Sequence, residues 1–257
     1  MLQVSDNGSV RIIALDRPEV RNALNVALLR QLRLALREAL DAAVRCLAVT
    51  GVGKSFSAGA DIAEWSEADE QDAIDGHPWM EECHGLIAEL AEFPKPTIAW
   101  LNGAAVGAGL DLALACDFRF AADSAKFQCA YTRMGYSPDG GGTWLLPRLI
   151  GLDQAKRFVY TGEFWSAAEA RARGLISEVH AADRLGAAVQ DFAAKLADGP
   201  TVAIGQAKQL MQAAAGRPLR EQLASELKAG EICAASEDAK EAMTAADERR
   251  PPVFKGR

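Results

Sequence analysis

Two short glycine-containing segments carry residues whose types and spacing suit chemistry on a carbonyl group. The first runs from Phe56 to Asp61 and the second from Asn102 to Asp111; each follows a strand-like apolar run and leads into helix-like sequence. A helix start leaves backbone N–H groups without partners, and small residues let a ligand approach the backbone closely. Two such starts facing each other would hold one oxygen between two N–H donors, which stabilises an enolate or a tetrahedral oxyanion. Ala58 and Ala108 are the candidate donors.

The elements that position these segments alternate between strands and helices, which indicates an α/β protein. Apolar periodicity predicts a helix over 25–42 and a second over 77–92, which Pro94 and Pro96 end. The polar residues 61–75 are expected to form a mobile loop or a short helix. Another helix opens near Gly107, one covers 141–150, and Ser166 begins a capping box that starts a further helix. Strands are predicted at 10–15, 46–50, 97–101, 118–121, 126–129 and 175–179, and three or four amphipathic helices at 183–249.

Several segments, taken together, resemble the crotonase (enoyl-CoA hydratase/isomerase) superfamily. They are Asp16–Asn25, the two glycine segments, Ala113–Asp117, Pro138–Pro147 and Glu248–Arg257, and they run nearly end to end. The resemblance implies a crotonase-like spiral of repeated ββα units over residues 1–198, which holds an acyl-CoA site. It also implies a C-terminal α-helical trimerisation region over residues 199–257.

In this family the amides at the positions of Ala58 and Ala108 bind the thioester oxygen of an acyl-CoA. Ala60, Asp61 and Ile62 match the loop whose backbone cradles the adenine and the pantetheine. Arg21 stands next to the position that contacts the coenzyme A phosphates. The resemblance therefore implies an acyl-CoA substrate, with no cofactor beyond the coenzyme A that the substrate carries.

The acid/base positions depart from those of a hydratase. Hydratases use two glutamates, and the matching residues here are Asp111, one methylene shorter, and Tyr131, which cannot serve as a carboxylate base. An acidic residue in the first turn of a helix is also favoured by the helix dipole alone. Asp111 thus has two readings, a catalytic carboxylate or a helix-stabilising one.

Asp139 lies in Ser137–Gly142, a loop that opens a helix. An aspartate there can simply cap the helix. Its position nevertheless matches the catalytic aspartate of the isomerase-like branch and of a dehalogenase branch, in which it is a nucleophile. One carboxylate beside an oxyanion hole suffices for a 1,3-proton shift, because it removes a proton from one carbon and returns it to another. The sequence favours Asp139 as a general base.

His84 stands on what looks like the apolar face of its helix, where a histidine is most often packed in the core. It also matches the histidine that the dehalogenase branch uses as a base. Hydrolysis or dehalogenation of an aryl- or alicyclic-CoA therefore stays open, as do enoyl-CoA hydration and a non-enzymatic CoA-binding scaffold. The leading hypothesis is an enoyl-CoA isomerase.

Net charge, histidine spacing and cysteine spacing limit which partners and ligands the protein can be expected to bind. The net charge of −7 argues against general affinity for nucleic acid or anionic membranes, and no signal peptide is visible. The segment from Gly51 to Ser55 lacks the first glycine of a P-loop. Neither His77 nor His180 has a partner at metal-ligand spacing, so no metal site is expected. The five scattered cysteines suggest reduced, buried thiols and a cytoplasmic protein. The C-terminal helices resemble those of family trimers and hexamers, and we expect a homotrimer or homohexamer.

Overall fold

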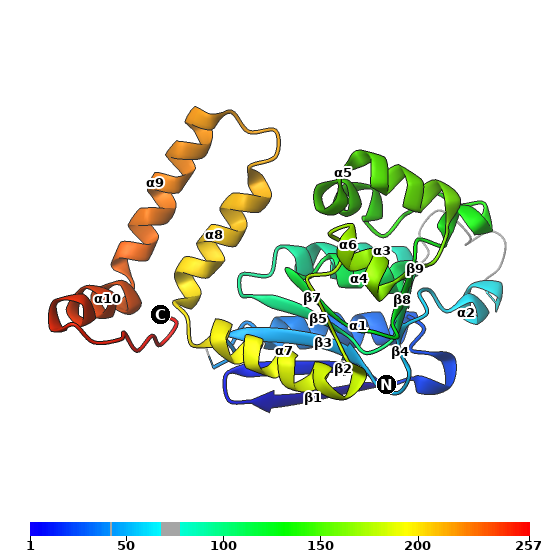
Figure 1. Cartoon of the computed structure of the whole chain (residues 1–257), viewed down its shortest axis with the longest axis horizontal. Coiled ribbons are helices and arrows are strands. Elements are labelled where there is room, and N and C mark those ends of the chain that lie inside the picture. Colours follow the sequence, from blue (N-terminus) through cyan, green and yellow to red (C-terminus); the bar gives the residue numbers. More distant parts are fainter. Residues whose placement is uncertain (42, 68–77) are drawn as a thin grey trace.

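The structure, a computed structural model, describes residues 1–41, 43–67 and 78–257. Two sheets form the core (Figure 1). The larger sheet has six strands in the order β1 (Leu2–Asn7), β2 (Val10–Leu15), β3 (Cys46–Gly51), β5 (Thr97–Leu101), β7 (Phe118–Ala122) and β10 (Glu178–His180). Only β1 and β2 pair antiparallel, and the others are parallel. Parallel strands covered on both faces are apolar throughout, and every residue of β3 is buried.

The smaller sheet consists of β4 (Ser55–Ser57), β6 (Ala104–Val106), β8 (Lys126–Gln128) and β9 (Trp165–Ser166). Each long strand from β3 to β7 leads into a short strand of this second sheet and then into a helix. These helices are α2 (Ile62–Glu67) and α3 (Pro78–Ala91), then α4 (Ala108–Leu114), then α5 (Gly142–Thr161). The predicted succession of ββα units is confirmed.

Helices cover the large sheet on both sides. α7 (Ala182–Ala197) lies across the face that is in front in Figure 1 and contacts β3, β5 and β7. α1 (Val26–Glu38) lies behind the sheet, packs against α3, and buries Leu28, Leu29, Leu32 and Leu36. α6 (Ala167–Ala172) begins at the capping box of Ser166.

Some boundaries differ from the sequence prediction. The last strand is Glu178–His180 rather than 175–179, because Leu175 and Ile176 are buried in the turn that follows α6. α5 extends to Thr161 across a kink at Gly151, whose φ of 74° is not helical. The short strands β4, β6 and β9 were not predicted, since two or three residues carry no readable alternation. Residues 68–75 of the expected loop, and His77, lie outside the described residues.

The C-terminal helices are α8 (Thr201–Ala213), α9 (Leu219–Ala235) and α10 (Glu237–Glu248). α8 and α9 run side by side and project away from the sheets (Figure 1). Polar contacts of buried or half-buried side chains tie this region to the core. Lys208 of α8 is buried and pairs with Asp117 at 3.0 Å. Arg45, just before β3, donates to the carbonyls of Gly199 and Phe254.

Candidate active site

The two glycine segments pack backbone against backbone. Gly59 has a φ of 94°, and a β-carbon there would come within 2.8 Å of the Val106 carbonyl oxygen and 3.4 Å of the Ala108 nitrogen. At Gly109 a β-carbon would lie 2.6 Å from the Ser57 side chain. Glycine is therefore required at both positions, and its absence of a side chain brings the end of β4 against the start of α4.

Ala108 is the first residue of α4, and its amide N–H makes no hydrogen bond within the part of the chain that the structure describes. Gly107 precedes it with a φ of 52°, and the Gly107 carbonyl already accepts from Leu110 and Asp111. The helix dipole adds a positive field at this amide. Ala108 thus has the free donor that the sequence predicted.

The structure shows that the prediction of the Ala58 amide as the second donor is wrong. Its N–H donates to the Arg21 carbonyl at 2.9 Å, so this amide is not available to a ligand. Asp61 likewise donates to the Leu24 carbonyl, at 3.1 Å. Between them the amide of Ala60 makes no hydrogen bond to any described residue. The free amide beside Ala108 is that of Ala60, which the sequence had placed in the coenzyme A loop.

The other predicted substrate-binding residues lie on neighbouring segments. Arg21 has a φ of 54° and an exposed side chain that makes no ion pair with the described residues. Ile62 is exposed, while the Asp61 carboxylate pairs with Arg17 at 2.8 Å. Asp61 therefore acts by holding its loop against the 17–24 segment, and Arg21 and Ile62 remain accessible.

Asn22, to which no sequence motif assigned a role, holds together the loop before α1 and the turn between β3 and β4. It is fully buried with a φ of 57°. Its side chain accepts from the Arg17 amide and donates to the carbonyls of Val52 and Ser55, at 2.9 to 3.0 Å. Its own carbonyl accepts from the Ser57 hydroxyl. One side chain thus ties the loop before α1 to both ends of the β3–β4 turn.

Asp111 lies one turn into α4 and is 1% exposed. Its Oδ2 accepts from the Tyr131 hydroxyl at 2.5 Å. Gly140 and Gly142 cover the carboxylate so closely that β-carbons there would lie 2.5 and 2.7 Å from its oxygens. Burial raises the pKa of Asp111 to about 7, against the lowering effect of the tyrosine. The same burial, with the Asp111 charge, raises the pKa of Tyr131.

Asp139 stands beside this pair, in the loop before α5. The N-cap of α5 is Gly141, and no side chain caps that helix, so Asp139 does not serve as the cap that the sequence left open. Its Oδ1 is buried and has no hydrogen-bond partner among the described residues. Burial raises the pKa of the Asp139 carboxyl, although Tyr131 and His84 oppose the shift. A half-buried carboxylate with an unsatisfied oxygen is a stronger base than a solvated one.

His84 is exposed rather than packed in the core, so the expectation from its helix face is wrong. Its Nε2 lies 2.7 Å from the carbonyl oxygen of Asp139. With Gly140, Gly141 and Trp144 it lines a cavity of about 720 Å³ that extends to Gln212 of α8. Among the predicted residues, His84 lines this cavity and contacts the Asp139 backbone, while Tyr131 is hydrogen-bonded to Asp111 behind the lining residues Gly140 and Gly141.

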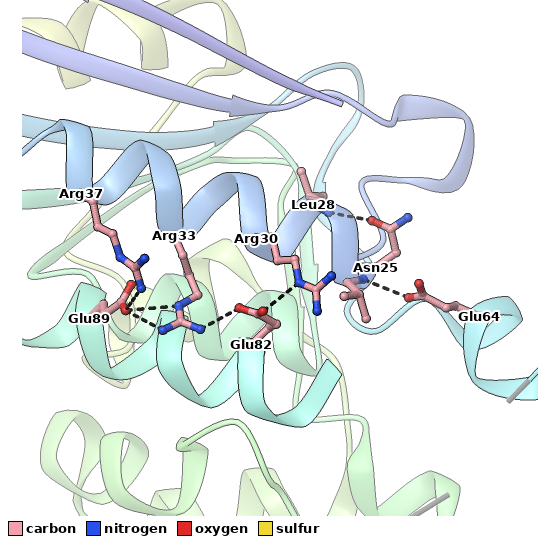
Figure 2. A network of polar contacts seen from close by, with 9 residues as sticks. Asn25, Leu28, Arg30, Arg33, Arg37, Glu64, Glu82 and Glu89 are labelled. Atoms are coloured by element: carbon pink, nitrogen blue, oxygen red, sulfur yellow. Dashed lines mark hydrogen bonds and ion pairs between the residues drawn. The ribbon is translucent and has the colours of Figure 1, made fainter. Parts of the chain in front are cut away.

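The helix that carries His84 is held by ion pairs to α1 (Figure 2). Arg33 of α1 lies between Glu82 and Glu89 of α3, at N···O distances of 2.6 and 2.7 Å. Its guanidinium lies over Gly85, where a β-carbon would come within 2.6 Å of the guanidinium carbon. The flanking pairs are Arg30 with Glu82 and Arg37 with Glu89. This network fixes α3, and hence His84, relative to the sheet.

Within the described ranges, no three His, Cys, Asp or Glu side chains are grouped as metal ligands would be. His180 instead pairs with Glu178 at 2.8 Å. No helix in these ranges is long and apolar enough to cross a membrane. All five cysteines are free; Cys46, Cys83, Cys116 and Cys129 are buried, and Cys233 is half-buried.

The sequence matches the enoyl-CoA hydratase/isomerase family over residues 5–257. The 2,3-dehydroadipyl-CoA hydratase of Escherichia coli (strain K12) is 37% identical, with 100% of this chain and 99% of that protein covered. The 1,2-epoxyphenylacetyl-CoA isomerase of the same organism is 36% identical, with 96% and 95% covered. A crystal structure of an enoyl-CoA hydratase from Bacillus anthracis shares the fold with a TM-score of 0.94 at 34% identity, covering 100% and 99%. With its fold and its paired glycine segments, this chain is an enzyme of the enoyl-CoA hydratase/isomerase family.

Proposed function

We propose that this enzyme is an enoyl-CoA isomerase that shifts a double bond along the acyl chain. The observation that carries the proposal is the pairing of Tyr131 with Asp111 beside Asp139. Tyr131 occupies the second glutamate position of a hydratase and engages the carboxylate at the first. Asp139 is left as the carboxylate with an unpartnered oxygen.

In the proposed reaction the thioester oxygen accepts hydrogen bonds from the amides of Ala60 and Ala108. Asp139 removes a proton from the acyl chain, and the resulting charge collects on that oxygen, where two N–H groups stabilise it. The protonated Asp139 then returns the proton to a different carbon, so the carboxylate is regenerated and no water is consumed. The reaction needs no metal and no cofactor besides the coenzyme A of the substrate.

The loop from Ala60 to Ile62 and the exposed side chain of Arg21 are proposed to hold the coenzyme A. Both lie on the segments that border the free amide of Ala60. His84 and Trp144 would then line the acyl end, since they border the cavity next to Asp139.

Assembly as a homotrimer or homohexamer is part of the proposal, with residues 199–257 as the oligomerisation region. Helix α9 and its neighbours expose large apolar side chains that a monomer leaves in water; they are Met211, Leu219, Leu223, Leu227, Ile232 and Met243. Light scattering at micromolar concentration should give three or six times the chain mass. We also propose a cytoplasmic location, with the free cysteines as support.

The test of function is turnover on matched thioesters. A 3-enoyl-CoA should be converted to the conjugated 2-enoyl-CoA, seen as a rise in ultraviolet absorbance without a change in mass. A gain of 18 mass units on a 2-enoyl-CoA would mean hydration through Asp111. Release of free acid from an aryl-CoA would mean hydrolysis through Asp139 and His84, and no turnover with tight thioester binding would mean a scaffold.

A further inference from the structure

The Tyr131 hydroxyl carries one proton and is hydrogen-bonded to one of the two carboxyl groups of this cluster. It donates to Oδ2 of Asp111 at 2.5 Å. It also lies close enough to Asp139 to lower the pKa of that carboxyl. Oδ1 of Asp139 is buried and accepts no hydrogen bond from any described residue. Two acceptors therefore compete for a single donor.

The burial of Asp111 leaves its carboxylate few alternatives to the Tyr131 hydroxyl as a hydrogen-bond donor. Asp111 is 1% exposed and is covered by Gly140 and Gly142, which leave no room for even a β-carbon. Among the described side chains, Tyr131 is the one hydrogen-bond partner of the Asp111 carboxylate. A buried polar group without a partner is costly, so the phenol proton follows whichever carboxyl is charged.

When Asp111 is ionised, the phenol donates to it and Oδ1 of Asp139 stays without a hydrogen bond. When Asp111 is protonated, its own O–H can donate to the phenol oxygen, and the phenol proton is free to turn toward Asp139. The change is a rotation of two O–H groups. It moves no proton between residues and needs no other reactant.

We propose that Tyr131 is a positioning residue whose hydroxyl couples the ionisation of Asp111 to the basicity of Asp139. The inference rests on the proposed function, in which Asp139 is the base. With Asp111 ionised, Oδ1 of Asp139 lacks the phenol as a donor and the carboxyl faces a like charge, and both conditions strengthen Asp139 as a base. With Asp111 protonated, Asp139 gains the phenol as a donor and is a weaker base.

The other titratable groups around the three residues do not supply this coupling. Cys83 of α3 and Cys129, just after β8, are buried thiols, and burial raises the pKa of each to about 12, so both are neutral. His84 of α3 contacts the backbone carbonyl of Asp139, and its ring lowers the pKa of that carboxyl. It makes no contact with Asp111 that would link the two carboxyls.

The coupling is visible in the acidic limb of kcat/KM against pH, which reports groups of the free enzyme. We expect two inflections in the unmodified enzyme, the upper near pH 7 where Asp111 ionises. Asp111→Asn should remove the upper inflection. Tyr131→Phe should move both inflections to higher pH, by about one unit, since the phenol lowers the pKa of each carboxyl. Tyr160→Phe, an exposed tyrosine on α5, is the matched control and should leave the profile unchanged.

A merely structural role for Tyr131 would lower kcat in Tyr131→Phe without moving the inflections, and that result would overturn the inference.

A second readout, the titration of the two aspartates by NMR, does not need turnover. With carboxyl-¹³C aspartate, the signals of Asp111 and Asp139 are identified by their loss in the two asparagine variants and are then titrated in the free enzyme. Asp139 should titrate at lower pH in Asp111→Asn and at higher pH in Tyr131→Phe. These shifts in an enzyme that turns over no enoyl-CoA would reject the proposed function and keep the coupling; turnover with an unshifted Asp139 would reject the coupling alone.

Discussion

The backbone of Gly59 lies against the amide of Ala108, so close that a β-carbon on Gly59 would stand 3.4 Å from the Ala108 nitrogen. This contact sets the spacing between the end of β4 and the start of α4. It places the free amide of Ala60, the next residue, beside the free amide of Ala108. The two donors can lie this close because the contacting positions, Gly59 and Gly109, are glycines and carry no side chain.

Ala108→Pro removes one of these donors without adding a helix-breaking residue, because proline is well tolerated at the first position of a helix. We expect kcat/KM to fall about a hundredfold or more. Ala182→Pro is the matched control: Ala182 is the exposed first residue of α7. Its amide likewise makes no hydrogen bond to a described residue. Equal turnover in the two proline variants, with both folded by circular dichroism, would remove the Ala108 amide from the mechanism.

Asp139→Asn keeps the size of the side chain and abolishes its basicity. We expect turnover of a 3-enoyl-CoA to drop about 10²- to 10⁴-fold, the usual contribution of a general base. Asp111→Asn should lose much less, because Asp111 acts through Tyr131 and not on the substrate. Both variants are compared at saturating substrate and pH 8. A larger loss in Asp111→Asn than in Asp139→Asn would make Asp111 the base and favour hydration.

The burial of Asp111 also makes stability depend on pH. Its pKa is raised from 3.8 to about 7 in the folded protein, so the folded state binds more protons than the unfolded state between these values. Stability contributed by this site is therefore present at low pH and lost as the pH rises from about 4 to 7. Asp111→Asn should be more stable than the unmodified protein at pH 8, by about 2–4 kcal/mol, and equal to it near pH 4. Urea titrations at the two pH values measure the difference; a constant difference would show that Asp111 is not titrating.

Asn22→Ala removes a side chain with three hydrogen bonds in a fully buried position. The variant leaves the Arg17 amide and the Val52 carbonyl without that partner, and it places alanine at a φ of 57°. We expect a loss of about 3–5 kcal/mol in the free energy of unfolding, from unpaired buried groups and backbone strain. Denaturant titration gives the value. A loss below about 1 kcal/mol would mean that the neighbouring loops hold together without Asn22.

The sequence predicted the strands and helices that carry long apolar patterns, because periodicity reports burial directly. It also singled out Asp139, Asp111, Tyr131 and His84, and the structure pairs Tyr131 with Asp111 and His84 with the Asp139 backbone. It missed which amide of the first glycine segment is free: Ala58 and Ala60 are both alanines, and only the bond from Ala58 to Arg21 tells them apart. The roles of Asn22 and Gly85 depend on partners more than 25 residues away, and local sequence carries no signal of them.

The contacts of Arg45 join the start of β3 to Gly199 and Phe254, and Lys208 joins α8 to Asp117. The contact of Arg45 with Phe254 joins residues 209 positions apart, and that of Lys208 with Asp117 joins residues 91 positions apart. Closing such long loops costs more chain entropy than pairing neighbouring strands does, so the docking of the C-terminal helices raises the contact order of the fold and slows its folding.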